Sequence, residues 1–69
     1  MTVYINGAKV LDRKVSMEDL DELERLVRLK GFTISELAKD GNDYEYTLRE
    51  PITSEQIREI QKQMEKNKS

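Results

Sequence analysis

The dipeptide Asn6-Gly7 constrains the fold of this chain most, because it lies between two short runs of alternating apolar and polar residues. Asn-Gly favours a two-residue type I′ turn, since both central positions of that turn need a positive φ angle. The sequence therefore predicts a β-hairpin at the start of the chain. Its core face carries two cross-strand pairs, Ile5 with Ala8 and Val3 with Val10.

Two later segments have the end signals and apolar spacing of amphipathic helices. Ser16 is a good N-cap for a helix over about residues 17–30, and Gly31 is a typical residue to end it. Thr53 caps a second helix in the same way. We expect the tail, about residues 66–69, to fray at the end of that second helix.

Residues 32–50 allow two interpretations, and the first is a second hairpin. Alternation with a period of two, interrupted by a three-residue turn at residues 40–42, fixes the register and the two faces. The pairs are Ala38 with Tyr44, Glu36 with Tyr46, and Ile34 with Leu48. This register places one charged residue, Glu36, on the core face and leaves Leu37 on the opposite face.

The second interpretation is helical. The segment from Leu26 to Ala38 resembles the first two helices of a repressor-type helix-turn-helix domain, which implies DNA binding through a recognition helix. The sequence departs from that family where residues 40–43 form a turn signal and residues 44–48 alternate. Residues 42–50 also offer three acidic side chains against Arg49 alone, whereas a recognition helix needs basic or amide groups. We therefore prefer the hairpin.

The sum is a single α+β domain over residues 1–69, in the order ββαββα. We expect a four-stranded antiparallel sheet with two helices packed on one face. The expected core is apolar and comes from all six elements: Val3, Ile5, Ala8, Val10, Met17, Leu20, Leu23, Val27, Phe32, Ile34, Tyr44, Tyr46, Leu48, Ile57, Ile60 and Met64.

Composition excludes several functional classes. The chain has no cysteine and no histidine, so it lacks the residues of Ser-His and Cys-His nucleophilic sites and the usual zinc ligands. Its three glycines, Gly7, Gly31 and Gly41, are too far apart for a phosphate-binding loop. We expect no enzyme activity, no cofactor and no metal ion.

Membrane association is not expected either. No run approaches the roughly 18 apolar residues that a spanning helix needs. The first residues lack the basic and apolar regions of a signal peptide. The sequence therefore predicts a soluble, cytoplasmic protein with no membrane partner.

What remains for function is a surface, and we expect it to bind a protein. Exposed apolar residues ringed by polar ones are typical of interfaces, and the open face of the sheet offers such a set. The candidate interface residues are Tyr4, Lys9, Leu11, Leu37, Thr47 and Arg49. The chain would then act as a small regulatory or accessory protein, of a kind also typical of phages and mobile elements, through this face or an edge strand.

Two other functions remain open. Nucleic acid could be bound through Lys9, Arg13, Lys14 and Arg49, using the first hairpin or a degenerate helix-turn-helix. The net charge of −2 argues against strong nonspecific binding of a polyanion. The third possibility is a structural protein that binds copies of itself.

Overall fold

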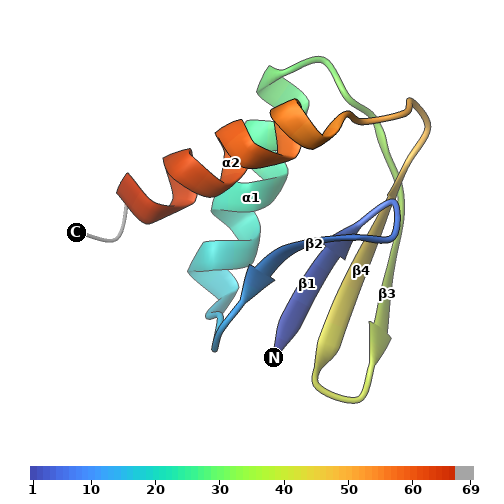
Figure 1. Ribbon diagram of the computed structural model, residues 1–69. Helices are drawn as coiled ribbons and strands as arrows, with labels where there is room; N and C mark the ends of the chain where they lie inside the picture. The colour runs from blue at the N-terminus through green and yellow to red at the C-terminus, as the bar shows by residue number, and fades with distance from the viewer. Residues whose placement is uncertain (67–69) are drawn as a thin grey trace.

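The computed structural model describes residues 1–66 and confirms the ββαββα order of an α+β fold. Its elements are β1 (Thr2–Ile5), β2 (Ala8–Asp12), α1 (Met17–Leu29), β3 (Ile34–Asp40), β4 (Asp43–Leu48) and α2 (Ser54–Lys66). The strands form one sheet in the order β2-β1-β4-β3, and both helices lie on the same side of it (Figure 1). Of the tail that we expected to fray, Lys66 belongs to α2 and residues 67–69 lie outside the described residues.

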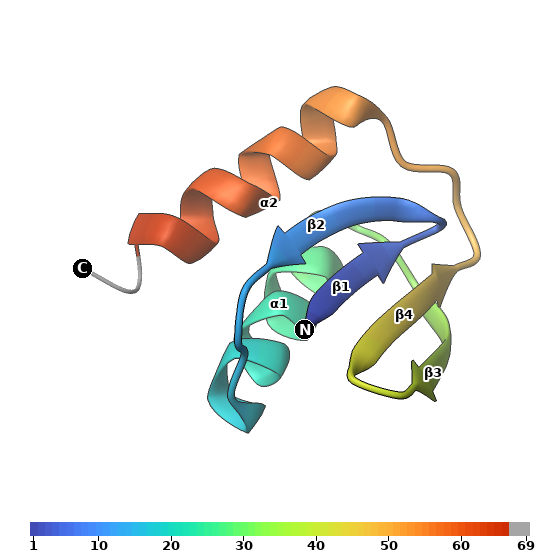
Figure 2. The same cartoon turned by 60° about the horizontal axis from the view of Figure 1, so that its bottom comes forward.

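The centre of the sheet corrects the expected all-antiparallel arrangement. Both hairpins are antiparallel, but β1 and β4 run parallel, with Val3 beside Tyr44 and Ile5 beside Tyr46. The cause is the crossover through α1, which returns the chain to the end of the sheet where β2 begins. As a result β3 runs in the direction of β2, and β4 runs in the direction of β1 (Figure 2). The sheet is therefore mixed.

The first hairpin has the predicted turn, with φ angles of 50° at Asn6 and 83° at Gly7. Ile5 lies opposite Ala8, as expected, but Val3 lies opposite Leu11 because of an irregularity between Val3 and Tyr4. The pairing leaves Val10 as the extra residue of a β-bulge. Val10 and Leu11 are consequently both buried, at 3% and 6% exposure. The expectation that Leu11 faces outward is wrong.

The second hairpin has a tighter turn than expected. Asp40 pairs with Asp43 across two residues, and the positive φ of Gly41 suits the first central position of such a turn. Leu37 therefore lies opposite Tyr46, on the helix side of the sheet, while Glu36 lies on the open side. A register shift between Ile34 and Glu36 restores the expected pairing of Ile34 with Leu48.

This register removes the charge that the expected hairpin placed on the core face. It also shows that the helix-turn-helix alternative is wrong, because residues 34–40 form a strand and residues 43–48 form its partner. The three-residue spacing of Ile34 and Leu37 reflects the bulge, which puts both on the helix side of the strand, whereas Ala38 lies on the open side.

Both helices begin at their predicted caps. The Ser16 hydroxyl accepts a hydrogen bond from the Asp19 N–H at 3.2 Å, and the Asp19 carboxylate accepts one from the Ser16 N–H at 3.0 Å. Thr53 and Gln56 make the same reciprocal pair at the start of α2. These capping boxes use backbone donors that a helix start otherwise leaves unpaired.

The core fills the space between the two helices and the sheet. Its buried apolar members are Val3, Ile5, Val10, Leu11, Val15, Leu20, Leu23, Val27, Tyr46, Leu48, Ile57, Ile60 and Met64. Met17 was expected among them, but this first residue of α1 is 71% exposed. Ala8, Phe32, Ile34 and Tyr44 are partly buried around this core.

Candidate functional site

The β3 strand is the most exposed element of the sheet. All of its seven residues are exposed except Ile34, which is half-buried. It forms the edge opposite β2, on the side away from α2 (Figure 1). A long exposed edge strand presents backbone donors and acceptors that another chain can use.

The register shows which backbone groups face outward. Asp40 and Asp43 close the two-residue turn, so they form a hydrogen-bonded pair, and pairs then alternate along the antiparallel ladder. Leu37 and Lys39 belong to non-hydrogen-bonded pairs, and their N–H and C=O groups therefore point away from β4. These two residues form the open hydrogen-bonding edge of the sheet.

The β2 edge is partly covered instead. The helix α2 runs beside β2 (Figure 2). The Gln61 Nε2 atom donates to the carbonyl oxygen of the bulge residue Val10 at 2.9 Å. Lys9 and Asp12 of the same strand form an ion pair at 3.5 Å. A bulge and a covering helix are both ways in which proteins prevent pairing at an edge.

The side chains of β3 divide between two surfaces. On the helix side, Leu37 lies beside the buried ring of Tyr46 and remains 45% exposed. The Lys39 ammonium lies 5.7 Å from the centre of the Tyr44 ring on that side, within cation–π range. On the open side, β3 presents Glu36, Ala38 and Asp40.

The structure brings together only part of the predicted interface. Tyr4 pairs with Lys9 on one side and with Glu45 on the other, so these residues share the open face with Thr47. Arg49 is exposed just beyond the end of β4. Leu11 lies in the core and Leu37 lies on the opposite side of the sheet, so neither belongs to this group.

The half of the open face near β3 is acidic. Glu36, Asp40 and Glu45 are exposed there, and within residues 1–66 no ion pair involves any of them. The neighbouring Asp43 carboxylate accepts a hydrogen bond from the Thr2 N–H at 3.0 Å. Sequence reasoning missed this patch because the wrong register placed Glu36 on the core face.

The four candidate nucleic-acid contacts do not form one cluster. Lys9 pairs with Asp12, and the Arg13 Nη1 atom lies 3.3 Å from the Asp19 carboxylate. Arg13 and Lys14 follow β2 at one end of the sheet, whereas Arg49 follows β4 at the opposite end (Figure 1). Three of the four charges are thus neutralised locally or separated from the others.

Asn6 connects the two hairpins through hydrogen bonds to β4, the strand next to β3, and to the segment that follows it. Its N–H donates to the Tyr46 carbonyl at 2.9 Å, and its Oδ1 atom accepts from the Leu48 N–H at 2.8 Å. Its Nδ2 atom also donates to the Glu50 carbonyl at 3.1 Å. The sequence showed only the turn preference of Asn6, and no local pattern indicates these bonds to residues forty or more positions later.

The Tyr46 hydroxyl fixes β4 beneath α1. It donates a hydrogen bond to Glu24 Oε2 at 2.9 Å, and burial, followed by the nearby Glu24 carboxylate, raises the pKa of Tyr46 far above its ordinary value. The neutral phenol is therefore a structural donor that holds the strand next to β3 in place.

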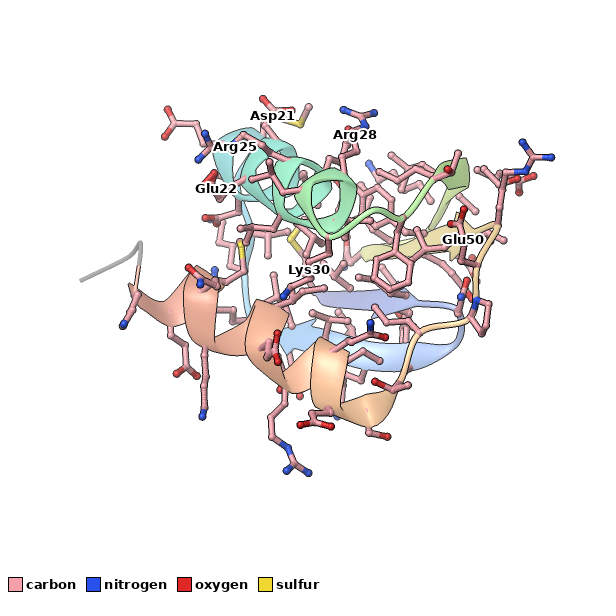
Figure 3. The ribbon with its side chains drawn as sticks, turned by 90° about the horizontal axis from the view of Figure 1, so that it is seen from above. Asp21, Glu22, Arg25, Arg28, Lys30 and Glu50 are labelled. Atoms are coloured by element: carbon pink, nitrogen blue, oxygen red, sulfur yellow. The ribbon has the colours of Figure 1, made fainter. Side chains whose placement is uncertain are left out.

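The outer surface of α1 is occupied by its own ion pairs. Arg25 binds Glu22 at 2.7 Å, and Arg28 lies 3.7 Å from Glu24 (Figure 3). Lys30 reaches across to Glu59 of α2 at 2.7 Å and lowers the pKa of that carboxyl group. Arg25, Arg28 and Lys30 on this surface are therefore already engaged in ion pairs within the chain.

Residues 1–66 contain no group of three or more acidic side chains placed to hold a metal ion. In the same part of the chain, neither helix has the length and apolar character needed to cross a membrane. Comparison with protein-family models, curated proteins and solved structures gives no match, so no relative suggests a function.

Proposed function

We propose that this protein is a non-enzymatic, cytoplasmic regulatory module that binds a partner protein by adding an extended segment of it to β3. Binding of this kind, in which a peptide extends a sheet at its edge, uses main-chain hydrogen bonds for affinity and side-chain positions for specificity. The observation that carries the proposal is the unpaired outer edge of β3, at Leu37 and Lys39.

The contrast with β2 supports this choice of edge. Gln61 of α2 binds the outward carbonyl of Val10 in β2, whereas neither helix has an equivalent hydrogen bond to β3 within residues 1–66. On the open face, the β3 residues Glu36, Ala38 and Asp40 would lie beside the side chains of an added strand, and Thr47 of β4 lies behind Glu36. No comparable feature favours nucleic acid.

A proline substitution at the outer edge tests the proposal. Lys39→Pro removes an outward N–H without removing a hydrogen bond to β4, because proline is tolerated where an edge strand faces solvent. Lys39→Thr is the matched control, since it removes the same charge but keeps the N–H and favours a strand.

We expect partners captured from a lysate to be retained by the wild-type protein and Lys39→Thr but lost by Lys39→Pro. In the captured complex, the Leu37 and Lys39 amide hydrogens should exchange more slowly than in the free protein. Circular dichroism checks that both variants remain folded. Equal capture by all three proteins, with unchanged exchange at these amides, would show that β3 is not the binding edge.

A further inference from the structure

The two sides of β3 differ in chemistry, and an added strand would meet both. Directly opposite residues in neighbouring antiparallel strands have Cβ atoms about 4.5–5.5 Å apart, so side chains interact across the pair. The open side presents the exposed carboxylates Glu36 and Asp40, with Glu45 on β4 behind them. Opposite charge on this side of an added strand is therefore favourable.

The helix side presents an apolar surface that continues from the core. Leu37 is 45% exposed, and Ile34 and Phe32 are half-buried and pack against the core. The charge on this side, Lys39, lies over the Tyr44 ring near the turn. An apolar side chain placed opposite Leu37 would remove its exposed surface from water, which is favourable by about 25 cal/mol per Å².

We infer that the segment that binds β3 is a strand that alternates basic and apolar residues. Its basic side chains lie on the open face beside Glu36 and Asp40, and its apolar side chains lie on the helix side beside Leu37. This inference rests on the proposed function, because it names the class of partner that the same edge selects. The charge complementarity sets specificity, while the backbone bonds of Leu37 and Lys39 set the position of the strand.

A second copy of this chain fits the edge less well. An antiparallel pairing centred on Leu37 would place the Glu36 and Asp40 side chains of both copies on one face of the joined sheet. In that pairing Glu36 lies opposite Ala38 and diagonally across from Glu36 of the other copy, within reach of a long side chain, so the two carboxylates repel each other. The acidic patch thus discourages self-pairing while it attracts a basic strand.

Three peptides with chemically capped termini, each as long as β3, test the inference. The first alternates Lys and Val, the second alternates Glu and Val, and the third has the composition of the first with its lysines and valines in separate blocks. NMR titration of the full chain at low salt gives the affinity of each peptide and the amides that it affects.

We expect the Lys-Val peptide to bind with shifts centred on Leu37 and Lys39, and at least about tenfold more tightly than the other two. Added salt should weaken this binding, because exposed charges are screened. In the double variant Glu36→Gln and Asp40→Asn, the preference for Lys-Val over Glu-Val should disappear. The control pair Asp21→Asn and Glu65→Gln changes net charge equally on the helices and should keep the preference.

The outcomes separate this inference from the proposed function. Equal binding of the Lys-Val and Glu-Val peptides at β3 would overturn the basic preference and leave the edge function standing. Equal binding of the block peptide would overturn the alternating pattern. A doubled mass in light scattering that Lys39→Pro abolishes would identify a second copy as the occupant and overturn the inference. If no peptide changes the NMR shifts of the β3 amides, the inference is also overturned. The proposed function is decided separately, by whether Lys39→Pro still captures partners from a lysate.

Discussion

The two edges of this sheet, β2 and β3, differ in whether a helix binds their outward backbone groups. At β2, a bulge buries Val10 and Leu11, and Gln61 of α2 binds the bulged carbonyl. At β3, a bulge also occurs, but within residues 1–66 no helix side chain forms a hydrogen bond to the strand, and the backbone groups of Leu37 and Lys39 point outward. The position of α2 makes the difference, since it lies along β2 and leaves β3 open (Figure 1).

This contrast shows that a bulge alone does not leave an edge strand without free backbone groups. In β2 the bulge supplies buried side chains on which a helix can pack, whereas in β3 it brings Ile34 and Leu37 to one side that only partly contacts the core. The exposed charges of Glu36, Lys39 and Asp40 are of the kind that disfavours pairing between edge strands.

The largest expected effect comes from removing the anchor of the covered edge. Ile60 is fully buried, and Ile60→Ala should lower the free energy of unfolding by about 2–5 kcal/mol, because a cavity remains beneath α2. The matched change on the open edge, Leu37→Ala, should cost less than about 1 kcal/mol, since that side chain is half exposed. Urea unfolding of both variants measures the difference. Similar losses at the two positions would contradict this account.

A smaller effect is expected at the junction between the hairpins. Asn6→Gly keeps the positive φ angle but removes the bonds to the Leu48 N–H and the Glu50 carbonyl, so it should cost about 1–3 kcal/mol. Asn6→Asp keeps an acceptor for the Leu48 N–H and should cost less. Thermal unfolding ranks the two variants, and an unchanged stability in Asn6→Gly would show that these bonds contribute nothing.

Removing the side chain that closes the β2 edge should have a modest effect. Gln61→Ala leaves the carbonyl of Val10 without its amide donor, which should cost about 1 kcal/mol. Gln63→Ala on the exposed side of the same helix is the control and should be close to neutral. If both variants unfold at the same urea concentration, the hydrogen bond does not protect this edge.

The smallest effect is a dependence on acid. Hydrogen bonding from the N–H of Thr33, just before β3, lowers the pKa of Glu50, which follows β4, and Lys30 lowers the pKa of Glu59 on α2. Each group therefore contributes stability above the ordinary carboxyl pKa of about 4.3, and this contribution is lost as pH falls through the lowered folded-state value. Stability measured from pH 7 downward should decline less steeply in Glu50→Gln and Glu59→Gln. A slope identical to wild type in both would contradict the prediction.

Local signals in the sequence predicted the elements but not their assembly. Asn6-Gly7 predicted the first turn, and Ser16 and Thr53 predicted both helix starts, because turns and caps depend on neighbouring residues. The parallel pairing of β1 with β4 depends on contacts between residues far apart in the chain. The spacing of apolar residues within either hairpin therefore does not predict this parallel pairing.

The candidate site was predicted in part for the same reason. Tyr4, Lys9 and Thr47 do share the open face, as strict alternation predicted. Leu11 and Leu37 do not, because a bulge in one hairpin and a shorter turn in the other shifted the alternation by one residue. The acidic character of the face near β3 became visible only with the correct register.

The parallel seam between β1 and β4 also has a consequence for how the chain folds. Each hairpin joins residues close in sequence, but the seam joins Thr2 to Asp43 across 41 positions. Pairing between distant segments is slow, because chain entropy is lost before the contacts form. We therefore expect closure of this seam to limit the folding rate, so that Asn6→Gly slows refolding in stopped-flow experiments more than it speeds unfolding. The first strand, β1, would then lack its second neighbour in the sheet until the last strand, β4, forms and pairs with it.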